Sequence, residues 1–358
     1  MAPNSRVEPA YLDRRTPPVV AIAPRVDRDR GEIMRFDDTL RLVAAVVAVT
    51  VGFVIADIFW AADSNVAVDG RSFIEFGKVM AMLAMIYVIL LLIDRRVAGD
   101  NTRMARAIIH ASASVRSLVW NAGLFIPLGF ASVYFMYLAS ATDRPLMDET
   151  LAVIDAHMWF RWRAFLELTN SVPIVAKVLV FAYHSLGPQL PLLFIVLAFI
   201  ADQRLRLTEF MSMLAVSSAL TATIMAFVSA AGAYAYFQPV AADFSNFTPH
   251  AGMWHYQELL RLRSGEPFSL LVTRAEGLAT FPSYHTVLGI LVVYALRDLP
   301  ALAWPVGVLN ALMVVSTLPE GGHHLTDVLA GAAVGVTTVM FTRALQYKLK
   351  PAPLTVAP

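Results

Sequence analysis

The chain has 358 residues, of which 58% are hydrophobic and 15% are charged, and its mean hydropathy is +0.61. Because soluble globular domains carry about a quarter charged residues, this composition excludes an ordinary soluble protein and favours one that crosses a membrane several times. The formal net charge of +1 gives no sign of a nucleic-acid partner, and the absence of cysteine excludes disulfides, thiolate metal ligands and cysteine nucleophiles.

Residues 1–37 form a polar segment that differs from the rest of the chain. The segment contains five prolines, seven arginines and six acidic residues, and its apolar residues follow no regular period. It buries too little apolar surface to offset the entropy of ordering, so we expect a mostly disordered cytoplasmic tail, with a second tail over residues 348–358. A cleavable signal peptide is not expected, because the first apolar run begins near Leu40.

Eight apolar runs follow this tail. Crossing about 30 Å of hydrocarbon takes about 20 helical residues, and continuous runs near this length favour helices over barrel strands. The runs lie near residues 40–61, 73–93, 115–139, 172–200, 208–236, 284–298, 301–318 and 324–345. We therefore predict an all-α polytopic membrane protein with about eight transmembrane helices.

Basic residues are distributed unequally between the two sets of connecting loops. With the N-terminus inside, seventeen lysine and arginine residues fall in the inner segments and seven in the outer ones. This distribution agrees with the positive-inside rule, so we expect both termini to be cytoplasmic and the protein to lie in the cell membrane. The two long outer loops, near 140–171 and 237–280, are where functional residues are expected.

Two local patterns lead to further expectations. The first outer loop contains residues 158–163, Met-Trp-Phe-Arg-Trp-Arg, which are typical of a helix lying in the membrane interface. In the fourth run, Tyr183-His184-Ser185 is followed by Pro188 and Pro191. We interpret this polar interruption as a kink, with a functional role as the alternative, because polar groups at membrane depth are costly.

Three polar clusters lie at helix ends on the predicted outer face. They are Tyr236-Phe237-Gln238-Pro239, Phe281-Pro282-Ser283-Tyr284-His285 and the segment 320–327, Glu-Gly-Gly-His-His-Leu-Thr-Asp. Helix starts present free N–H groups that attract phosphate, and glycines allow the backbone to approach a ligand closely. Because all three clusters lie on the same predicted side of the membrane, we expect them to form one site.

Pairs of residues in two of these clusters suit phosphoryl transfer without a metal. His323 and Asp327 are four residues apart, so they share a face of a helix and can meet. A carboxylate bonded to one imidazole nitrogen leaves the other nitrogen as a nucleophile or base. Ser283 can cap the sixth span, which places His285 in the first turn of that helix.

The same residues resemble two motifs of the type 2 phosphatidic acid phosphatase superfamily. Pro282-Ser283-Tyr284-His285 is similar to its PSGH motif, and the spacing of Ser316, His323 and Asp327 is that of its third motif. The resemblance implies a six-helix catalytic core over residues 115–347, with the site at the outer membrane face. Residues 38–114 would then supply two additional helices and an inner loop.

The resemblance also implies a role for each matching residue. His323 would attack phosphorus to form a phosphohistidine, Asp327 would orient His323, and His285 would protonate the leaving group. The phosphate contacts would come from Ser283, Tyr284 and Gly322. No cofactor is expected, and the partner is a membrane lipid substrate.

Two residues close to His323 in the sequence are interpreted as having no catalytic role. His324 is interpreted as a neighbour of the nucleophile, since only His323 has an aspartate four residues later. Glu320, which lies in a short outer turn, is expected to be solvated. Neither residue is assigned a part in the reaction.

The departures from the family pattern bear on the substrate. Tyr284 stands where glycine is usual and Thr317 where arginine is usual, while Ala231 and Gln238 stand where the first motif has lysine and arginine. Three cationic phosphate ligands are therefore missing, which suits a phosphodiester better than a doubly charged monoester. This favours the branch resembling inositol phosphorylceramide synthase and sphingomyelin synthase, which moves phospho-headgroups between lipids.

Other interpretations remain open. Gln238 and the loop residues Arg261, Arg263 and Arg274 are candidates for the missing phosphate contacts, which would permit a phosphatase acting on phosphatidic acid or a polyprenyl diphosphate. A metalloenzyme is disfavoured, because the eight histidines are dispersed along the chain. A transporter without chemistry is a further alternative, although only the fourth run is clearly interrupted.

Overall fold

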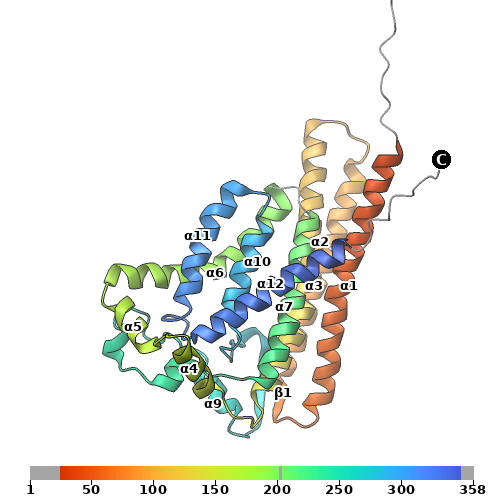
Figure 1. Cartoon of the computed structure of the whole chain (residues 1–358). Coiled ribbons are helices and arrows are strands. Elements are labelled where there is room, and N and C mark those ends of the chain that lie inside the picture. Colours follow the sequence, from red (N-terminus) through yellow and green to blue (C-terminus); the bar gives the residue numbers. More distant parts are fainter. Residues whose placement is uncertain (1–24, 201–203, 348–358) are drawn as a thin grey trace, which may run out of the picture. The chain divides into compact units, whose positions relative to one another are not determined.

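The structure is a computed structural model that describes residues 25–200 and 204–347 (Figure 1). The chain divides into two compact units, Met1–Asp37 and Asp38–Pro358, and the second unit holds the helices described below except for the first residues of α1. Helix α1 begins at Arg25, within the segment 1–37 that was expected to be a mostly disordered tail. The remaining parts of the two expected tails, residues 1–24 and 348–358, lie outside the described residues.

The prediction of an all-α membrane protein is confirmed. Within the described residues, six helices are long and apolar enough to cross a membrane. They belong to α1 (Arg25–Ala61), α2 (Gly70–Val97), α3 (Arg103–Ser140), α6 (Pro173–Ile195, continued by the π-helical turn η1, Val196–Ile200), α7 (Arg204–Phe227) and α12 (Leu325–Tyr347). The sixth and seventh expected spans are the shorter apolar helices α10 (Tyr284–Ala295) and α11 (Pro300–Ser316).

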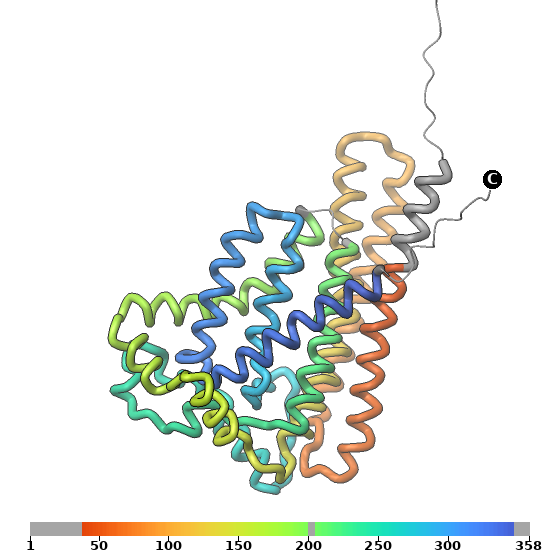
Figure 2. The backbone as a smooth tube through the Cα atoms, viewed as in Figure 1, coloured from red at the N-terminus to blue at the C-terminus, as the bar shows by residue number. Residues whose placement is uncertain are grey.

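The long helices form a continuous series of packed neighbours. Helix α2 packs on α3, α3 on α7, α7 on α12, α12 on α10, α10 on α11 and α11 on α6. Helix α7 is therefore central, with α1–α3 on one side of it and α6, α10 and α11 on the other (Figure 2). Its side chains Leu207, Phe210 and Met211 are fully buried, because neighbours cover this helix on several faces.

Short elements gather at one end of this bundle (Figure 1). They are α4 (Asp148–His157), α5 (Trp162–Asn170), α8 (Ala233–Phe237), α9 (Tyr256–Leu262) and the 3₁₀ turns η2 (Ala241–Phe244) and η3 (Val272–Arg274). Two strands that the sequence did not predict, β1 (Val66–Val68) and β2 (Phe268–Leu270), pair in parallel and join the connection between α1 and α2 to the long loop before α10.

Of residues 158–163, where a helix was expected, only Trp162 and Arg163 are helical, as the first residues of α5. The chain turns there, between α4 and α5, with Trp159 at a positive φ of 61° and 95% exposed. Trp162, by contrast, is buried and its indole N–H donates to the carbonyl of Leu318 at 3.1 Å. One tryptophan of this segment is therefore exposed and the other is buried, a difference that the composition of the segment does not reveal.

Candidate active site

The turn before α12 holds the central pair of the site. His323 Nδ1 lies 3.2 Å from Asp327 Oδ2, as the four-residue spacing predicted. Asp327 is fully buried and His323 is 5% exposed, so this contact is shielded from water. Because Nδ1 donates to the carboxylate, the lone pair of His323 is on Nε2.

Helix α10 brings the second motif to the same nitrogen. Ser283 Oγ lies 3.4 Å from His323 Nε2, and the same oxygen accepts from the N–H of Thr286, which confirms Ser283 as the cap of α10. His285 follows in the first turn, and its ring centroid is 6.3 Å from that of His323. The two imidazoles are thus close but not in direct contact, which suits a group that reacts between them.

Helix α6 supplies two residues whose role the sequence interpretation missed. The ring of Tyr183 stacks on that of His285, with centroids 4.6 Å apart and planes 20° apart. His184 Nε2 donates to Glu320 Oε1 at 3.0 Å. Helix α6 continues through Pro188 and Pro191, and the functional role that the sequence left as the alternative is supported by these two contacts. Both polar residues therefore belong to the site.

Glu320 is buried rather than solvated, which corrects the sequence interpretation. Besides His184, its carboxylate accepts from the hydroxyl of Thr248 at 2.6 Å and from the N–H of Thr248 at 3.2 Å. Its own carbonyl accepts from the N–H of Gly252 at 2.8 Å. Glu320 therefore joins the turn before α12 to both α6 and the second outer loop.

His324 lies between two carboxylates of α4. Its Nε2 is 3.5 Å from Asp148 Oδ1 and its Nδ1 is 3.6 Å from Asp155 Oδ2, which are ion-pair distances rather than hydrogen bonds. Burial acts to lower the pKa of His324, but the facing carboxylates of Asp148 and Asp155 outweigh burial and raise that pKa to about 9. A protonated His324 thus holds α4 against the turn that carries His323.

Asp155 also caps α12. Its carboxylate accepts from the N–H groups of Leu325 and Thr326 at 2.9 and 2.8 Å and from the Thr326 hydroxyl at 2.6 Å. Although burial acts to raise the pKa of Asp155, the facing His324 ring and the hydrogen bonds from Thr326 lower it below the usual range. The expectation that the start of α12 offers free amides to a phosphate is therefore wrong, since a carboxylate already occupies them.

The ion pair around His324 predicts a loss of stability at alkaline pH. The folded pKa of about 9 exceeds the unfolded value of 6.5, so the stabilisation is complete below about pH 6.5 and is lost as the pH rises through about 9. We expect the melting temperature of the purified protein to fall between pH 7 and pH 10. In His324→Gln it should be lower at pH 7 and nearly flat over this range.

The matched control is His250→Gln, because His250 is an exposed loop residue. This variant should keep the alkaline fall of the wild-type protein. An equal alkaline fall in His324→Gln and in the wild-type protein would contradict the assignment.

Residues expected to bind phosphate through their side chains lie in several places. The Tyr284 hydroxyl is hydrogen-bonded to Ser217 and Ser218 of α7, at 3.3 and 3.0 Å, so this contact joins α10 to α7. Gln238 is the exposed C-cap of α8, with a left-handed backbone at φ 49°. Gly322, in contrast, directly precedes His323 and has φ 71°.

The loop arginines make their contacts away from the imidazole pair. The Arg261 guanidinium lies 5.1 Å from the ring centroid of Phe268, and Arg263 donates to the carbonyls of Ser140 and Arg144. Arg274 belongs to the 3₁₀ turn η3. The structure therefore does not bring Arg261 and Arg263 together with His323 and His285.

Neutral residues occupy the positions where the family pattern has cations. Thr317 is fully buried and its hydroxyl donates to the carbonyl of Val314 at 2.6 Å. The N–H of Ala231 donates to Asp148 at 2.9 Å, while its carbonyl accepts from His255 Nε2 at 3.0 Å. Burial lowers the pKa of His255, which favours its neutral form. These positions therefore bring no fixed positive charge to the site.

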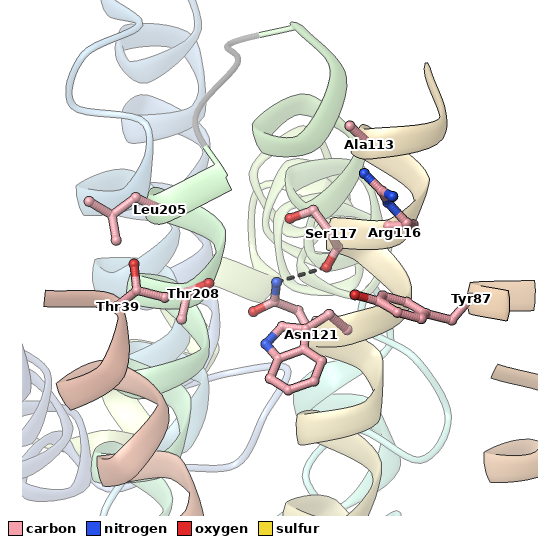
Figure 3. Close-up of a pocket in the computed structure, with 9 residues that line it drawn as sticks. Thr39, Tyr87, Ala113, Arg116, Ser117, Asn121, Leu205 and Thr208 are labelled. Carbon is pink, nitrogen blue, oxygen red and sulfur yellow. Dashed lines mark hydrogen bonds between the residues drawn. The ribbon is translucent and has the colours of Figure 1, made fainter. Parts of the chain in front are cut away.

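A cavity of about 270 Å³ that shares none of its lining residues with this site lies between α1, α2, α3 and α7 (Figure 3). It is lined by Thr39, Tyr87, Ala113, Arg116, Ser117, Trp120, Asn121, Leu205 and Thr208. Asn121 donates to the carbonyl of Ser117 at 2.8 Å, and Arg116 is paired with Asp94. The cavity lies at the first turns of α7, whereas Tyr284, the residue before His285, contacts α7 further along the helix, at Ser217 and Ser218. With no histidine or acid among its lining residues, this cavity is not the site of the proposed chemistry.

A comparison with known protein families identifies the superfamily to which these motifs belong. The profile of the PAP2 superfamily matches residues 149–341, which is more than half of the 358 residues. The chain belongs to the PAP2 superfamily. The matched region begins in α4, ends in α12 and contains both imidazoles and Asp327. No curated protein and no solved structure matched the chain.

Membership of the PAP2 superfamily supports an enzyme that acts on a lipid phosphoester, since members are generally phosphatases or phosphotransferases. It does not favour the metalloenzyme or transporter alternatives. Among the described residues, no three histidine, aspartate or glutamate side chains form a group that could hold a metal ion.

Proposed function

We propose that this PAP2 superfamily member transfers a phospho-headgroup from one membrane lipid to another through a phosphohistidine on His323. One observation carries the proposal: the bond from Nδ1 to Asp327 leaves Nε2 of His323 beside Ser283 and facing His285. The coupling of an oriented nucleophile to a nearby acid is the arrangement that covalent catalysis requires.

The reaction would proceed in two balanced steps. First, the lone pair of His323 Nε2 attacks phosphorus, the bond from phosphorus to the leaving oxygen breaks, and His285 donates a proton to that oxygen. Asp327 stabilises the positive charge that develops on His323. Second, the hydroxyl of the acceptor attacks phosphorus, His285 takes its proton, and the P–N bond breaks to restore His323. With water as the acceptor, the same steps give a phosphatase.

The lack of cationic side chains at the family's phosphate-binding positions supports a phosphodiester substrate over a phosphomonoester substrate. Thr317 and Ala231 stand where the family pattern has cations, and Arg261 and Arg263 make their contacts elsewhere. A monoester carries nearly two negative charges at neutral pH and a diester carries one. A transferase of the inositol phosphorylceramide synthase type is therefore favoured, with a lipid phosphatase as the second candidate.

We further propose the arrangement of the protein in its membrane. The excess of basic residues in alternate loops supports cytoplasmic termini in the cell membrane and a site on the extracytoplasmic face. The short elements α4, α5, α8 and α9 would then form an outer cap over the site. The catalytic core would be residues 115–347, preceded by the two additional helices of residues 38–114.

A lipid panel tests the reaction class. Purified protein in phosphatidylcholine nanodiscs would be given phosphatidic acid, a polyprenyl diphosphate, or phosphatidylinositol together with a ceramide. Free phosphate and new lipid species would be measured by mass spectrometry. We expect a new phosphodiester lipid from the donor and acceptor pair. Phosphate release from the monoester and the diphosphate alone would reject the transferase and support the phosphatase.

The proposed nucleophile predicts how turnover responds to chelation. Because the electron pair that attacks phosphorus comes from His323 and the proton from His285, we expect turnover to persist after dialysis against EDTA and phenanthroline. The measurement is the initial rate before and after dialysis. Loss of turnover that returns with an added divalent ion would contradict the mechanism.

A further inference from the structure

Asp57 is a buried acid that the proposed reaction does not use. It lies in the membrane-spanning part of α1, Asp38–Ala61, one turn before the helix ends, and it is 5% exposed. An ionised carboxylate inside a membrane is costly unless it is paired, so such a residue usually marks a functional site.

The carboxyl group faces an apolar cavity of about 400 Å³ between α1, α2 and α3. The cavity is lined by Thr50, Val54, Asp57, Ile58, Ala61, Val68, Phe73, Phe76, Pro127, Phe130, Ala131 and Tyr134. Its size is within the range of about 300–1,000 Å³ typical of small-molecule sites. It lies in the helices that precede the family match, and it is separate from the imidazole pair.

The other polar groups of the cavity donate no hydrogen bond to Asp57. The Thr50 hydroxyl donates to the carbonyl of Val46 at 2.8 Å, and the Tyr134 hydroxyl donates to the carbonyl of Val66 at 3.2 Å. Asp57 Oδ1 is buried without a hydrogen-bond partner. The Arg71 guanidinium, in the first turn of α2, is engaged by Asp69 at 2.7 Å. Within the described residues, the cavity thus contains an acceptor without a donor.

We propose that this cavity binds a single-chain amphiphile with a protonated primary amine. The ammonium group would pair with Asp57, and the hydrocarbon chain would pack against Phe73, Phe76 and Phe130. An ammonium group supplies both the missing hydrogen bonds and the opposite charge, whereas a hydroxyl group supplies only a hydrogen bond. The position of Asp57 near the end of α1 places the charged head toward the membrane surface, where such amphiphiles carry their charge.

A photoreactive dodecylamine tests the site in the full-length protein. The protein would be titrated in phosphatidylcholine nanodiscs, and labelling would be quantified and mapped by mass spectrometry. We expect saturable labelling of peptides that contain the cavity residues 50–76 and 127–134. Competition by unlabelled dodecylamine should exceed competition by dodecanol at least about tenfold.

The matched pair of variants is Asp57→Asn and Asp63→Asn. Asp63 is an exposed aspartate in the connection after α1, so it controls for general attraction of the amine to acidic surface. We expect Asp57→Asn to weaken labelling at least about tenfold and Asp63→Asn to leave it unchanged.

Equal labelling of Asp57→Asn and wild type, equal competition by dodecanol, or labels outside the cavity would each overturn the proposal. Should Asp57→Asn fail to fold, the label map and the competition on the wild-type protein decide the question alone. Lipid phosphoester turnover would be measured separately, because the proposed binding does not depend on it.

Discussion

Replacing His323 by alanine is expected to lower turnover at least about 10³-fold, because the variant has no nucleophile to form the covalent intermediate. The side chain contacts Asp327 and Ser283 only through its two ring nitrogens, at 3.2 and 3.4 Å. The fold should therefore survive. The measurement is the rate of new lipid formation by variant and wild-type protein with matching size-exclusion profiles.

Two further variants separate the nucleophile from its neighbours. His285→Ala should lower turnover by about 10²–10⁴-fold, the usual contribution of a general acid or base. His250→Ala, in an exposed loop segment, should leave turnover unchanged. Wild-type turnover in His323→Ala would disprove the phosphohistidine mechanism, and so would radioactive phosphate retained on His323→Ala after denaturation.

Replacing Gly322 by alanine is expected to lower both stability and turnover. A Cβ at this position would lie 2.6 Å from Gly252 Cα and 3.0 Å from the ring of Tyr234, and φ is 71°. The left-handed backbone alone costs about 1–2 kcal/mol, and overpacking adds about 1–3 kcal/mol. Because His323 is the next residue, the shift that relieves the clash would also move the proposed nucleophile. We expect the melting temperature to fall by several degrees and turnover by at least about tenfold.

Gly265→Ala is the matched control. Gly265 has a similar φ of 77°, but a Cβ there would meet nothing within 4 Å. This variant should therefore lose only the stability that the backbone conformation costs, and its turnover should be close to that of the wild type. Similar losses in Gly265→Ala and Gly322→Ala would show that close packing against Gly252 is not what constrains the turn before α12.

The contacts that the sequence predicted correctly are those that depend on position within one helix or one turn. The contact between His323 and Asp327 was predicted from their four-residue spacing, although His323 lies in the turn before α12 and not on the helix itself. The Ser283 cap follows from the preference of serine for helix starts. The long apolar runs likewise predicted the spanning helices, because about twenty apolar residues in a helix match the thickness of the hydrocarbon core. Each of these features has its physical cause within a short stretch of chain.

The surroundings of His323 and His285 were decided by tertiary structure alone. Asp155 caps a helix that begins 170 residues later, and Glu320 meets His184 across 136 residues. The sequence around such polar residues contains no local pattern from which their partners could be predicted. Their pairing is set by which helices pack together, and the free energy of that packing is shared among many apolar side chains rather than located in any motif. Sequence by itself therefore determined the helices and the contact between His323 and Asp327. Only the packed bundle decided that the carboxylates of Asp148, Asp155 and Glu320 surround the turn that carries His323, while Arg261 and Arg263 make their contacts elsewhere.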